Sequence, residues 1–376
     1  MKKALVSVTN DLSADQRVHR TALTLSGMGY KVVVVGRRLS CSPPLYDRSY
    51  HTHRMRLLFS KGAFFYAEYN LRLFFYLLFH PATLLIANDL DTLLPNFLAS
   101  KIKSVPLVYD SHEYFTGVPE LSDRKAIRTV WKLIEKFIFP RLKYVCTVNE
   151  SIAAIYKKEY HTEVKAIRNV PLLQETAIKS AVETRKSLGL PENKNILILQ
   201  GAGININRGA EEAVKAMQYL DNAVLVIAGK GDVMGALKKL TGELKLEDRI
   251  IFTGLLPFEE LRKYTMSADI GLTLDKDTNI NYRYSLPNKL FDYIHAGIAV
   301  LAYPLAEVKK IITAHRVGAF IENHDPRHIA EKIREMLGNP AQLASWKENA
   351  KKSAAGLCWQ EEEKKLSELI LRATTA

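Results

Sequence analysis

The sequence predicts an α/β protein made of two doubly wound domains in tandem. Short, nearly uninterrupted apolar runs alternate with segments of helical period along most of the chain. Continuous apolar strands between helices are typical of parallel sheets that are covered on both faces. The alternation is broken near the middle by a polar stretch, and 376 residues, 47% of them apolar, suffice for two cores.

The first half of the chain supplies one such alternation. Helices are expected between its strands, at residues 14–28, 91–102, 123–139 and 150–160. The strand-like runs read ALVSV, KVVVVG, TLLIAN, PLVYD and YVCTV.

The second half of the chain shows the same alternation of strand-like and helical segments. Helices are expected at residues 208–218, 232–245, 257–267, 287–296, 305–313 and 326–337, followed by two closing helices at 340–354 and 358–371. The strand-like runs read NILILQG, AVLVIAG, RIIFTG, DIGLTL, IAVLAY and GAFI.

We therefore expect an N-terminal domain at 1–172, a linker at 173–194 and a C-terminal domain at 195–357. The linker has no strand period and ends in Gly-Leu-Pro-Glu-Asn. In open α/β sheets, ligands bind beyond the carboxyl ends of the strands, so the cleft between two such sheets is the expected site.

Charge is distributed unevenly. Residues 1–180 contain 26 Lys and Arg against 15 Asp and Glu, a balance of +11, whereas the remainder has a balance of only +2. A basic half suits an anionic partner: nucleic acid, anionic lipid or an acidic substrate. A solvated basic surface without a partner is the plain alternative, and no nucleic-acid recognition motif is present.

Cellular location is read from the cysteines and the apolar segments. Three cysteines at wide spacings form neither a disulfide framework nor a metal pattern, which indicates a reducing cytoplasm. The N-terminal run is too short for a signal peptide, and no segment offers about 18 uncharged apolar residues for a membrane span.

Glycines follow several strands of the second half. Gly201 and Gly203 precede an Arg208-Gly209 pair that opens a helix, and such a helix start suits a phosphate. Tight turns would explain the same glycines without any ligand. The other glycines at strand ends are Gly229, Gly231 and Gly254.

The stretch SLPNKLFDYIHAG carries the strongest signal. Pro287 fits the first turn of a helix and Gly297 fits its C-terminal cap, which places Lys289 near the positive helix end. A cation is poorly placed there unless an anion binds. Asp292, one turn on, is suited to accept hydrogen bonds from a ribose diol; a simple Lys289–Asp292 surface pair is the alternative.

In the first half, Asp15 and Arg17 follow the first strand, and Asp110, His112 and Glu113 follow a later one. A histidine between two carboxylates at a strand end is suited to bind a sugar hydroxyl or to move a proton. A histidine that only caps a loop is the alternative. Two Asp-x-Asp triplets, at 89–91 and 275–277, are weak metal candidates, and we expect no metal site.

These stretches together resemble the GT-B glycosyltransferases, specifically the retaining group-1, family 4-like enzymes. The resemblance covers nearly the whole chain in order. The residues that carry it are DQRVHRTALTLSGMGYKVVVVG, YDSHEYF, GAGININRGAEEAVKAM, VLVIAGKGD, RIIFTGLLPFEELRKYTMSADIGLTL and SLPNKLFDYIHAGIAVLAYPLAEV.

The resemblance implies two Rossmann-like domains, a nucleotide-diphosphate sugar as donor, and no metal or other cofactor. It places Arg208 and Lys289 at the donor diphosphate, Asp292 at the ribose, Gly254 beside the base and His112 near the donor sugar, and it makes His112, Arg208 and Lys289 the catalytic candidates. It also implies that helix 358–371 packs back on the first domain. Further donor-side candidates are Gly201, Gly203, Gly229, Gly231, Tyr284 and Asn288, and the acceptor-side candidates are Asp15, Arg17 and Glu113.

Three departures from the family pattern bear on function. Tyr284 replaces the first Glu of the Glu-x7-Glu motif, Ala202 replaces a frequent arginine, and NDLSADQR replaces the double glycine after the first strand. The expected activity is transfer from a UDP-sugar to a glycan or lipid-linked glycan in surface polysaccharide biosynthesis. The alternatives are an epimerase or hydrolase on the same fold and a weakened GT-B partner protein.

Residues 61–81, KGAFFYAEYNLRLFFYLLFHP, are unusually aromatic. Glu68, Asn70 and Arg72 interrupt the stretch, so it is not expected to span a bilayer. Beside a basic surface it suits an interfacial helix on an anionic membrane, which would make the protein peripheral on the inner face of the cell membrane. The alternative is a helix packed under the first sheet.

Overall fold

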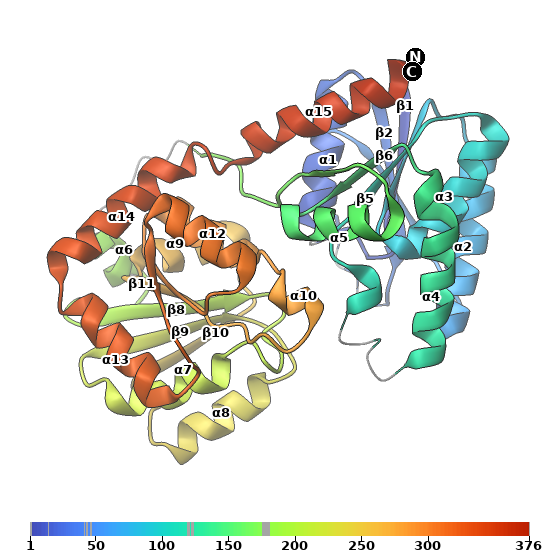
Figure 1. Cartoon of the computed structure of the whole chain (residues 1–376). Coiled ribbons are helices and arrows are strands. Elements are labelled where there is room, and N and C mark those ends of the chain that lie inside the picture. The colour runs from blue at the N-terminus through green and yellow to red at the C-terminus, as the bar shows by residue number, and fades with distance from the viewer. Residues whose placement is uncertain are drawn as a thin grey trace. The chain divides into compact units, whose positions relative to one another are not determined.

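The computed structural model describes residues 2–13, 15–40, 42, 44–45, 47–118, 121, 124–174 and 181–375. The chain divides into two compact units (Figure 1). The first consists of Met1–Asn169 and Trp359–Ala376, and the second of Val170–Cys358.

A seven-stranded sheet forms the centre of the first unit, with strand order β3-β2-β1-β4-β5-β6-β7 and every pair parallel. Parallel strands require crossover connections, and α-helices supply most of them. The strands are β1 (Lys3–Ser7), β2 (Lys31–Arg38), β3 (His51–Arg56), β4 (Leu84–Asn88), β5 (Leu107–Ser111), β6 (Tyr144–Thr147) and β7 (Val164–Ala166).

The helices of the first unit bury apolar side chains. In α2 the buried residues form one stripe, Phe65, Tyr69, Leu73 and Leu77, spaced by four residues as a packed helix face requires. The helices are α1 (Gln16–Gly27), α2 (Gly62–Phe79), α3 (Leu90–Lys103), α4 (Lys125–Ile138), α5 (Glu150–Tyr160) and α15 (Trp359–Thr375).

The last helix of the chain completes the first unit. From α15, Trp359, Leu366 and Ile370 join the core formed by β1, β2 and α1, and α15 lies beside α1 (Figure 1). Glu362, whose side chain is fully buried, accepts hydrogen bonds from the backbone N–H of Arg168 (3.0 Å) and from Arg168 Nε (2.7 Å).

A six-stranded parallel sheet of order β10-β9-β8-β11-β12-β13 forms the second unit. Alternate residues of β8 enter cores on opposite faces, Leu197 on one and Ile196 on the other, so both faces are covered. The strands are β8 (Asn195–Gly201), β9 (Ala223–Gly229), β10 (Ile250–Gly254), β11 (Ile270–Thr273), β12 (Ala299–Ala302) and β13 (Gly318–Phe320).

Helices cover both faces of this second sheet. Its α11 begins after Pro287 and ends at Gly297, whose φ of 68° lies in the left-handed region, as the sequence predicts. The helices are α6 (Ala181–Ser187), α7 (Ala210–Ala216), α8 (Met234–Glu243), α9 (Phe258–Ser267), α10 (Ile280–Arg283), α11 (Asn288–Ala296), α12 (Ala306–His315), α13 (Pro326–Leu337) and α14 (Pro340–Ala354).

The predicted linker is in part structured. Residues 175–180 lie outside the described residues, but α6 follows them, and Arg185 on α6 forms an ion pair with Asp269 at 2.8 Å. Leu190 is 4% exposed and packs into the core of the second unit. Among the described residues, no helix is long and apolar enough to cross a membrane.

Candidate functional site

A buried carboxylate organises the cations at the carboxyl edge of the second sheet. Asp275 follows β11 and has a fully buried side chain. Its Oδ1 lies 2.8 Å from Arg208 Nη1, and its Oδ2 lies 2.9 Å from Lys289 Nζ. Burial raises the pKa of Asp275, but Lys289 and Arg208 outweigh that effect and hold the pKa below its ordinary value. The two cations predicted at the diphosphate therefore converge on one point.

Local structure directs each cation to that point. Gly209, with φ of 77°, precedes α7, and a Cβ there would lie 2.4 Å from Leu274, so only glycine lets the Arg208 loop approach β11 this closely. Arg208 also stacks on Tyr282, with 4.4 Å between the guanidinium carbon and the ring centroid. Lys289 lies in the first turn of α11, where the helix N-terminus adds a positive field.

Lys289 pairs with Asp275, whereas Asp292 forms a hydrogen bond with Gln200. Asp292 Oδ2 accepts a hydrogen bond from Gln200 Nε2 at 2.9 Å, and Gln200 Oε1 in turn accepts one from Thr265 Oγ1 at 2.7 Å. Asp292 and Gln200 also line a pocket together with residues of α9 and the chain before α6. The alternative reading, a simple Lys289–Asp292 surface pair, is thus replaced by two separate interactions. Tyr284 and Asn288 lie between α10 and the first turn of α11, on the segment that leads to Lys289.

Close backbone approach explains two of the predicted glycines. A Cβ on Gly229 would lie 1.8 Å from the carbonyl oxygen of Gly201, and one on Gly231 would lie 2.0 Å from that of Ile204. A Cβ on Gly203 would meet its nearest atom only at 3.8 Å. Gly254 has φ of 71° and open space around it. Packing of the chain on itself therefore requires Gly229 and Gly231, whereas it does not require a glycine at 203.

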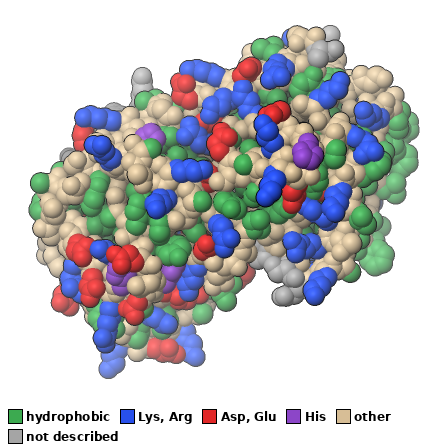
Figure 2. Space-filling model, viewed as in Figure 1, with side chains coloured by type: hydrophobic (Ala, Val, Ile, Leu, Met, Phe, Trp, Pro, Cys, Tyr) green, Lys and Arg blue, Asp and Glu red, His purple; other side chains and the backbone are tan. Residues whose placement is uncertain are grey.

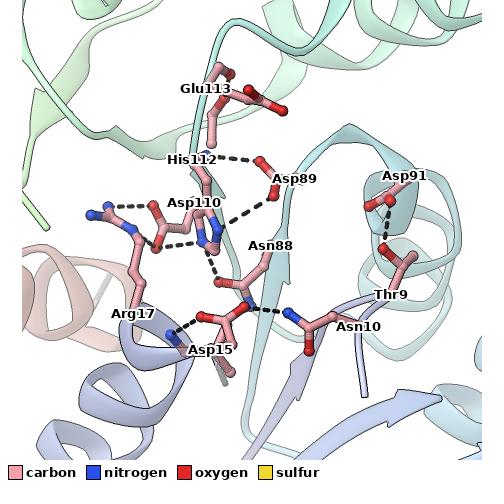
Figure 3. Close-up of polar contacts among 12 residues, drawn as sticks. Thr9, Asn10, Asp15, Arg17, Asn88, Asp89, Asp91, Asp110, His112 and Glu113 are labelled. Carbon is pink, nitrogen blue, oxygen red and sulfur yellow. Dashed lines mark hydrogen bonds and ion pairs between the residues drawn. The ribbon is translucent and has the colours of Figure 1, made fainter. Parts of the chain in front are cut away.

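A second polar cluster lies at the carboxyl edge of the first sheet (Figure 3). His112, just beyond β5, has its backbone N–H 2.8 Å from Asp89 Oδ1 and its Nε2 3.1 Å from Asn88 Oδ1. Its Nδ1 lies 3.4 Å from Asp89 Oδ2, and its Nε2 lies 3.6 Å from Asp110 Oδ2. The carboxylates around the imidazole are therefore Asp89 and Asp110, not Glu113, which points away from the cluster in Figure 3.

The charge of His112 follows from these neighbours. Burial alone lowers the pKa of His112, but Asp89 and Asp110 outweigh it and raise that pKa to about 9. Burial and the nearby Asp89 raise the pKa of Asp91 to about 7. A protonated imidazole and a carboxyl group that titrates near neutral pH thus lie at the same edge of the first sheet. Perturbed pairs of this kind are typical of functional sites.

Two acceptor-side candidates hold the cluster together. Arg17, only 3% exposed, binds Asp110 through Nε (2.9 Å) and Nη2 (2.6 Å), and donates from Nη1 to the carbonyl of Ile167 (2.7 Å). Asp15 caps α1 by accepting from the backbone N–H of Val18. Arg17 is too buried to contact a ligand directly. It can influence a ligand only by positioning Asp110, which in turn positions His112.

Asp89 was expected only as part of a weak metal triplet. In the structure it contacts His112, and its backbone φ of 60° is a strained value for a residue other than glycine. Asp91 accepts from Thr9 Oγ1 at 2.6 Å, while Asp275 and Asp277 pair with Lys289 and Arg283. No cluster of three metal-ligating side chains is found in the part of the chain that is described.

Comparison with protein families identifies the class of protein. The model for glycosyl transferases group 1 matches residues 181–353, and the model for glycosyltransferase family 4 matches residues 14–171. The chain belongs to this family of GT-B glycosyltransferases, which confirms the resemblance and the fold class read from the sequence.

Two curated relatives are similar over part of their length. An uncharacterized glycosyltransferase of Methanocaldococcus jannaschii is 29% identical over 92 residues, which cover 24% of this chain and 23% of the relative. D-inositol 3-phosphate glycosyltransferase 1 of Catenulispora acidiphila is 24% identical over 192 residues, which cover 48% of this chain and 44% of the relative. The chain thus spans less than half the length of each.

Solved structures share the fold over the whole chain. Sucrose-phosphate synthase from Thermosynechococcus elongatus superimposes with a TM-score of 0.80 at 16% identity, covering 99% of both chains. HepE of Anabaena, solved in complex with UDP, superimposes with a TM-score of 0.73 at 15% identity, covering 99% of this chain and all of the other.

Proposed function

We propose that this protein transfers a sugar, with retention of configuration, from a UDP-sugar to a glycan or lipid-linked glycan during synthesis of a surface polysaccharide. The observation that carries the donor half of the proposal is the convergence of Arg208 and Lys289 on Asp275 beside the start of α11. Two cations and a helix N-terminus form an environment suited to a diphosphate. The UDP bound by HepE supports uracil as the base.

In the proposed reaction, the bond between the anomeric carbon and the diphosphate oxygen breaks, and a bond to an acceptor hydroxyl oxygen forms as that hydroxyl passes its proton to the departing diphosphate. Arg208, Lys289 and the α11 N-terminus stabilise the negative charge that develops on the leaving diphosphate. Asp292 binds the ribose, and the Gly254 loop lies beside the base. Because these cations supply the positive charge, we expect no metal requirement.

The first unit supplies His112, which is expected near the donor sugar, and the acceptor side of the proposal. The protonated imidazole of His112, oriented by Asp89 and Asp110, is a hydrogen-bond donor for a sugar hydroxyl or an acidic group. Glu113, exposed at the next position, carries a carboxylate that we propose accepts a hydrogen bond from an acceptor hydroxyl.

We further propose that this unit lies on an anionic membrane, at the cytoplasmic face. Besides its buried stripe, α2 exposes Phe64, Phe75 and Phe79, the last being 75% exposed. Figure 2 shows hydrophobic side chains gathered along the edge where α2 lies in Figure 1, with Lys and Arg nearby. Interfacial helices combine such a face with neighbouring cations.

The transfer is tested by product analysis with radiolabelled UDP-sugars and a membrane extract. Labelled glycan or glycolipid together with UDP supports the proposal. Free sugar and UDP without any acceptor product would indicate a hydrolase, and a changed nucleotide sugar would indicate an epimerase. Nucleotide binding without any product would indicate a weakened partner protein, the alternative that is suggested by Tyr284 at the position of the family's glutamate.

Membrane association is tested by co-sedimentation with vesicles of neutral or anionic phospholipid at low and high salt. Binding only to anionic vesicles, reduced by salt and by Phe75→Asp with Phe79→Asp, supports the proposal. Equal sedimentation of the double variant would show that the exposed face of α2 does not carry the binding.

A further inference from the structure

A groove runs between the first half of α2 and the first turns of α4. Its volume is about 720 Å³, within the range of about 300–1,000 Å³ typical of small-molecule sites. Its walls are largely apolar and aromatic. The apolar and aromatic residues that line it include Phe65, Tyr66, Leu94, Phe115, Ile127, Val130, Trp131 and Ile134.

The aromatic side chains of the groove are held in place by each other. The Trp131 ring, 8% exposed, lies edge-on to Tyr66 at 5.1 Å and to Phe115 at 5.3 Å between centroids. Aromatic rings fixed in this way offer a preformed surface to an apolar chain, because little side-chain entropy is lost on binding.

Positive charge lines the same groove. Arg37, Lys61 and Arg124 are among its lining residues, and no carboxylate among the described residues forms an ion pair with any of them. Arg37 stacks on Phe65 at 4.5 Å and donates to the carbonyl of Ser60 at 3.2 Å, which brings it beside Lys61 at the start of α2. Among the described residues, the buried Nε of Arg37 has no hydrogen-bond partner. A guanidinium charge that no carboxylate of the described residues balances favours an anion nearby.

One part of the groove lies near the carboxyl edge of the first sheet. Glu113 lines the groove, and it is the residue next to His112. Arg37 lies near the carboxyl end of β2 and Glu113 just beyond that of β5, and both ends lie at the same edge of the parallel sheet, with β1 and β4 between them. A molecule in the groove would therefore have its apolar part between the helices and its polar part toward this edge, which also carries His112.

We propose that this groove binds the hydrocarbon chain of an acceptor lipid whose phosphate is held by Arg37 and Lys61. The occupant is a single-chain anionic amphiphile with an apolar tail and a phosphate-bearing head. The inference rests on the proposed transfer to a lipid-linked acceptor and adds where that acceptor binds. It is separate from the membrane face, since Phe75 and Phe79 do not line the groove.

The position of Trp131 allows a direct test on the full chain. The probe is 12-bromododecyl phosphate below its micelle concentration, because bromine quenches nearby tryptophan fluorescence. We expect saturable quenching in the wild type, loss of that signal in Trp131→Phe, and at least tenfold weaker binding of 12-bromododecanol, which lacks the phosphate. Quenching that does not saturate, or that persists in Trp131→Phe, would overturn the proposal.

Matched variants separate the groove from the surrounding surface. Ala67→Phe fills the groove, whereas Ala126→Phe makes the same change at an exposed position on α4 outside it. Val130→Asp and Leu133→Asp form a second pair, 56% and 62% exposed, of which only Val130 lines the groove. We expect at least tenfold weaker probe binding for Ala67→Phe and Val130→Asp and unchanged binding for their partners. If the two variants within each pair bound the probe with equal affinity, the probe would bind outside the groove.

UDP binding, measured on the same samples by thermal shift, distinguishes the two proposals. UDP binding without saturable quenching would overturn the proposal that the groove binds an amphiphile, and it would leave the proposed glycosyltransfer unaffected. Saturable quenching without UDP binding overturns the glycosyltransfer, and with it the role of the bound amphiphile as acceptor.

Discussion

Lys289 Nζ lies 2.9 Å from Asp275 Oδ2, so the cation at the start of α11 is balanced in the free protein by a carboxylate from the end of β11. Arg208 shares the same carboxylate. Asp275 therefore holds two cations at the position where the proposed diphosphate binds. A diphosphate would compete with Asp275 for the hydrogen bonds that Arg208 and Lys289 donate.

The first prediction concerns these cations. Arg208→Ala and Lys289→Ala should each weaken UDP binding about 10- to 100-fold, because a hydrogen bond to a charged group contributes about 1.5–3 kcal/mol. Arg283→Ala, which removes a nearby exposed cation paired with Asp277, is the control and should bind UDP normally. Titration calorimetry measures all three. Wild-type affinity in both site variants would remove them from the donor site.

The second prediction concerns Asp275→Asn. The variant should be less stable by about 3–5 kcal/mol, because it leaves two partly buried cations without their counter-charge. UDP should then raise its melting temperature more than that of the wild type, since the diphosphate restores the missing negative charge. Differential scanning fluorimetry with and without UDP measures both effects. An equal or smaller UDP shift in the variant would argue against a diphosphate at this point.

The third prediction concerns Asp292→Asn. The carboxylate that accepts from Gln200 becomes an amide, so hydrogen bonding to a ribose diol weakens and UDP affinity should fall several-fold. For 2′,3′-dideoxy-UDP the loss should be smaller. Losses of the same size with both nucleotides would make Asp292 a structural residue that acts through Gln200.

The fourth prediction concerns pH. Because the pKa of His112 is raised to about 9 from an ordinary value of 6.5, its charge stabilises the fold fully below pH 6.5, and this stabilisation is lost as pH rises through about 9. The loss should be about 1–3 kcal/mol, since a tenfold change in an ionisation constant corresponds to about 1.4 kcal/mol. Denaturant unfolding of wild type and His112→Gln between pH 6 and 10 measures it. Parallel pH profiles for the two proteins would contradict the assigned charge.

The fifth prediction separates two kinds of glycine. Gly229→Ala should unfold at markedly lower denaturant concentration, because its Cβ would overlap the carbonyl oxygen of Gly201. Gly203→Ala should keep wild-type stability, because its Cβ has room. If Gly203 contacts the donor, the second variant should still lose UDP affinity. Normal UDP binding by Gly203→Ala would exclude a close contact.

Most of the fold was predictable because parallel strands buried on both faces leave uninterrupted apolar runs. The two edge strands of the first sheet escaped prediction for a physical reason. His51–Arg56 reads His-Thr-His-Arg-Met-Arg, with mostly exposed side chains, and Val164–Ala166 has three residues. An edge strand is paired on one side only and is less buried, so its sequence need not be apolar.

The candidate site was predictable where a residue type is unusual for its position, as with Lys289 at a helix start. It was not predictable where the signal is pairing in space. Asp275 and Asp89 look alike as parts of Asp-x-Asp triplets, yet one holds two cations and the other orients His112. The partners of the two aspartates, Arg208 and Lys289 for Asp275 and His112 for Asp89, are distant in sequence. The periodicity of the sequence carries no information about such contacts.

The return of the chain to the first unit has a consequence for biosynthesis. Because α15 belongs to that unit, the ribosome completes the second unit, Val170–Cys358, before the first has all of its residues. Domains commonly fold in the order in which they are synthesised. Here the unit whose synthesis begins first is completed last. Until Trp359, Leu366 and Ile370 emerge from the ribosome, the apolar surface that they cover on the first unit is open to chaperones or to aggregation.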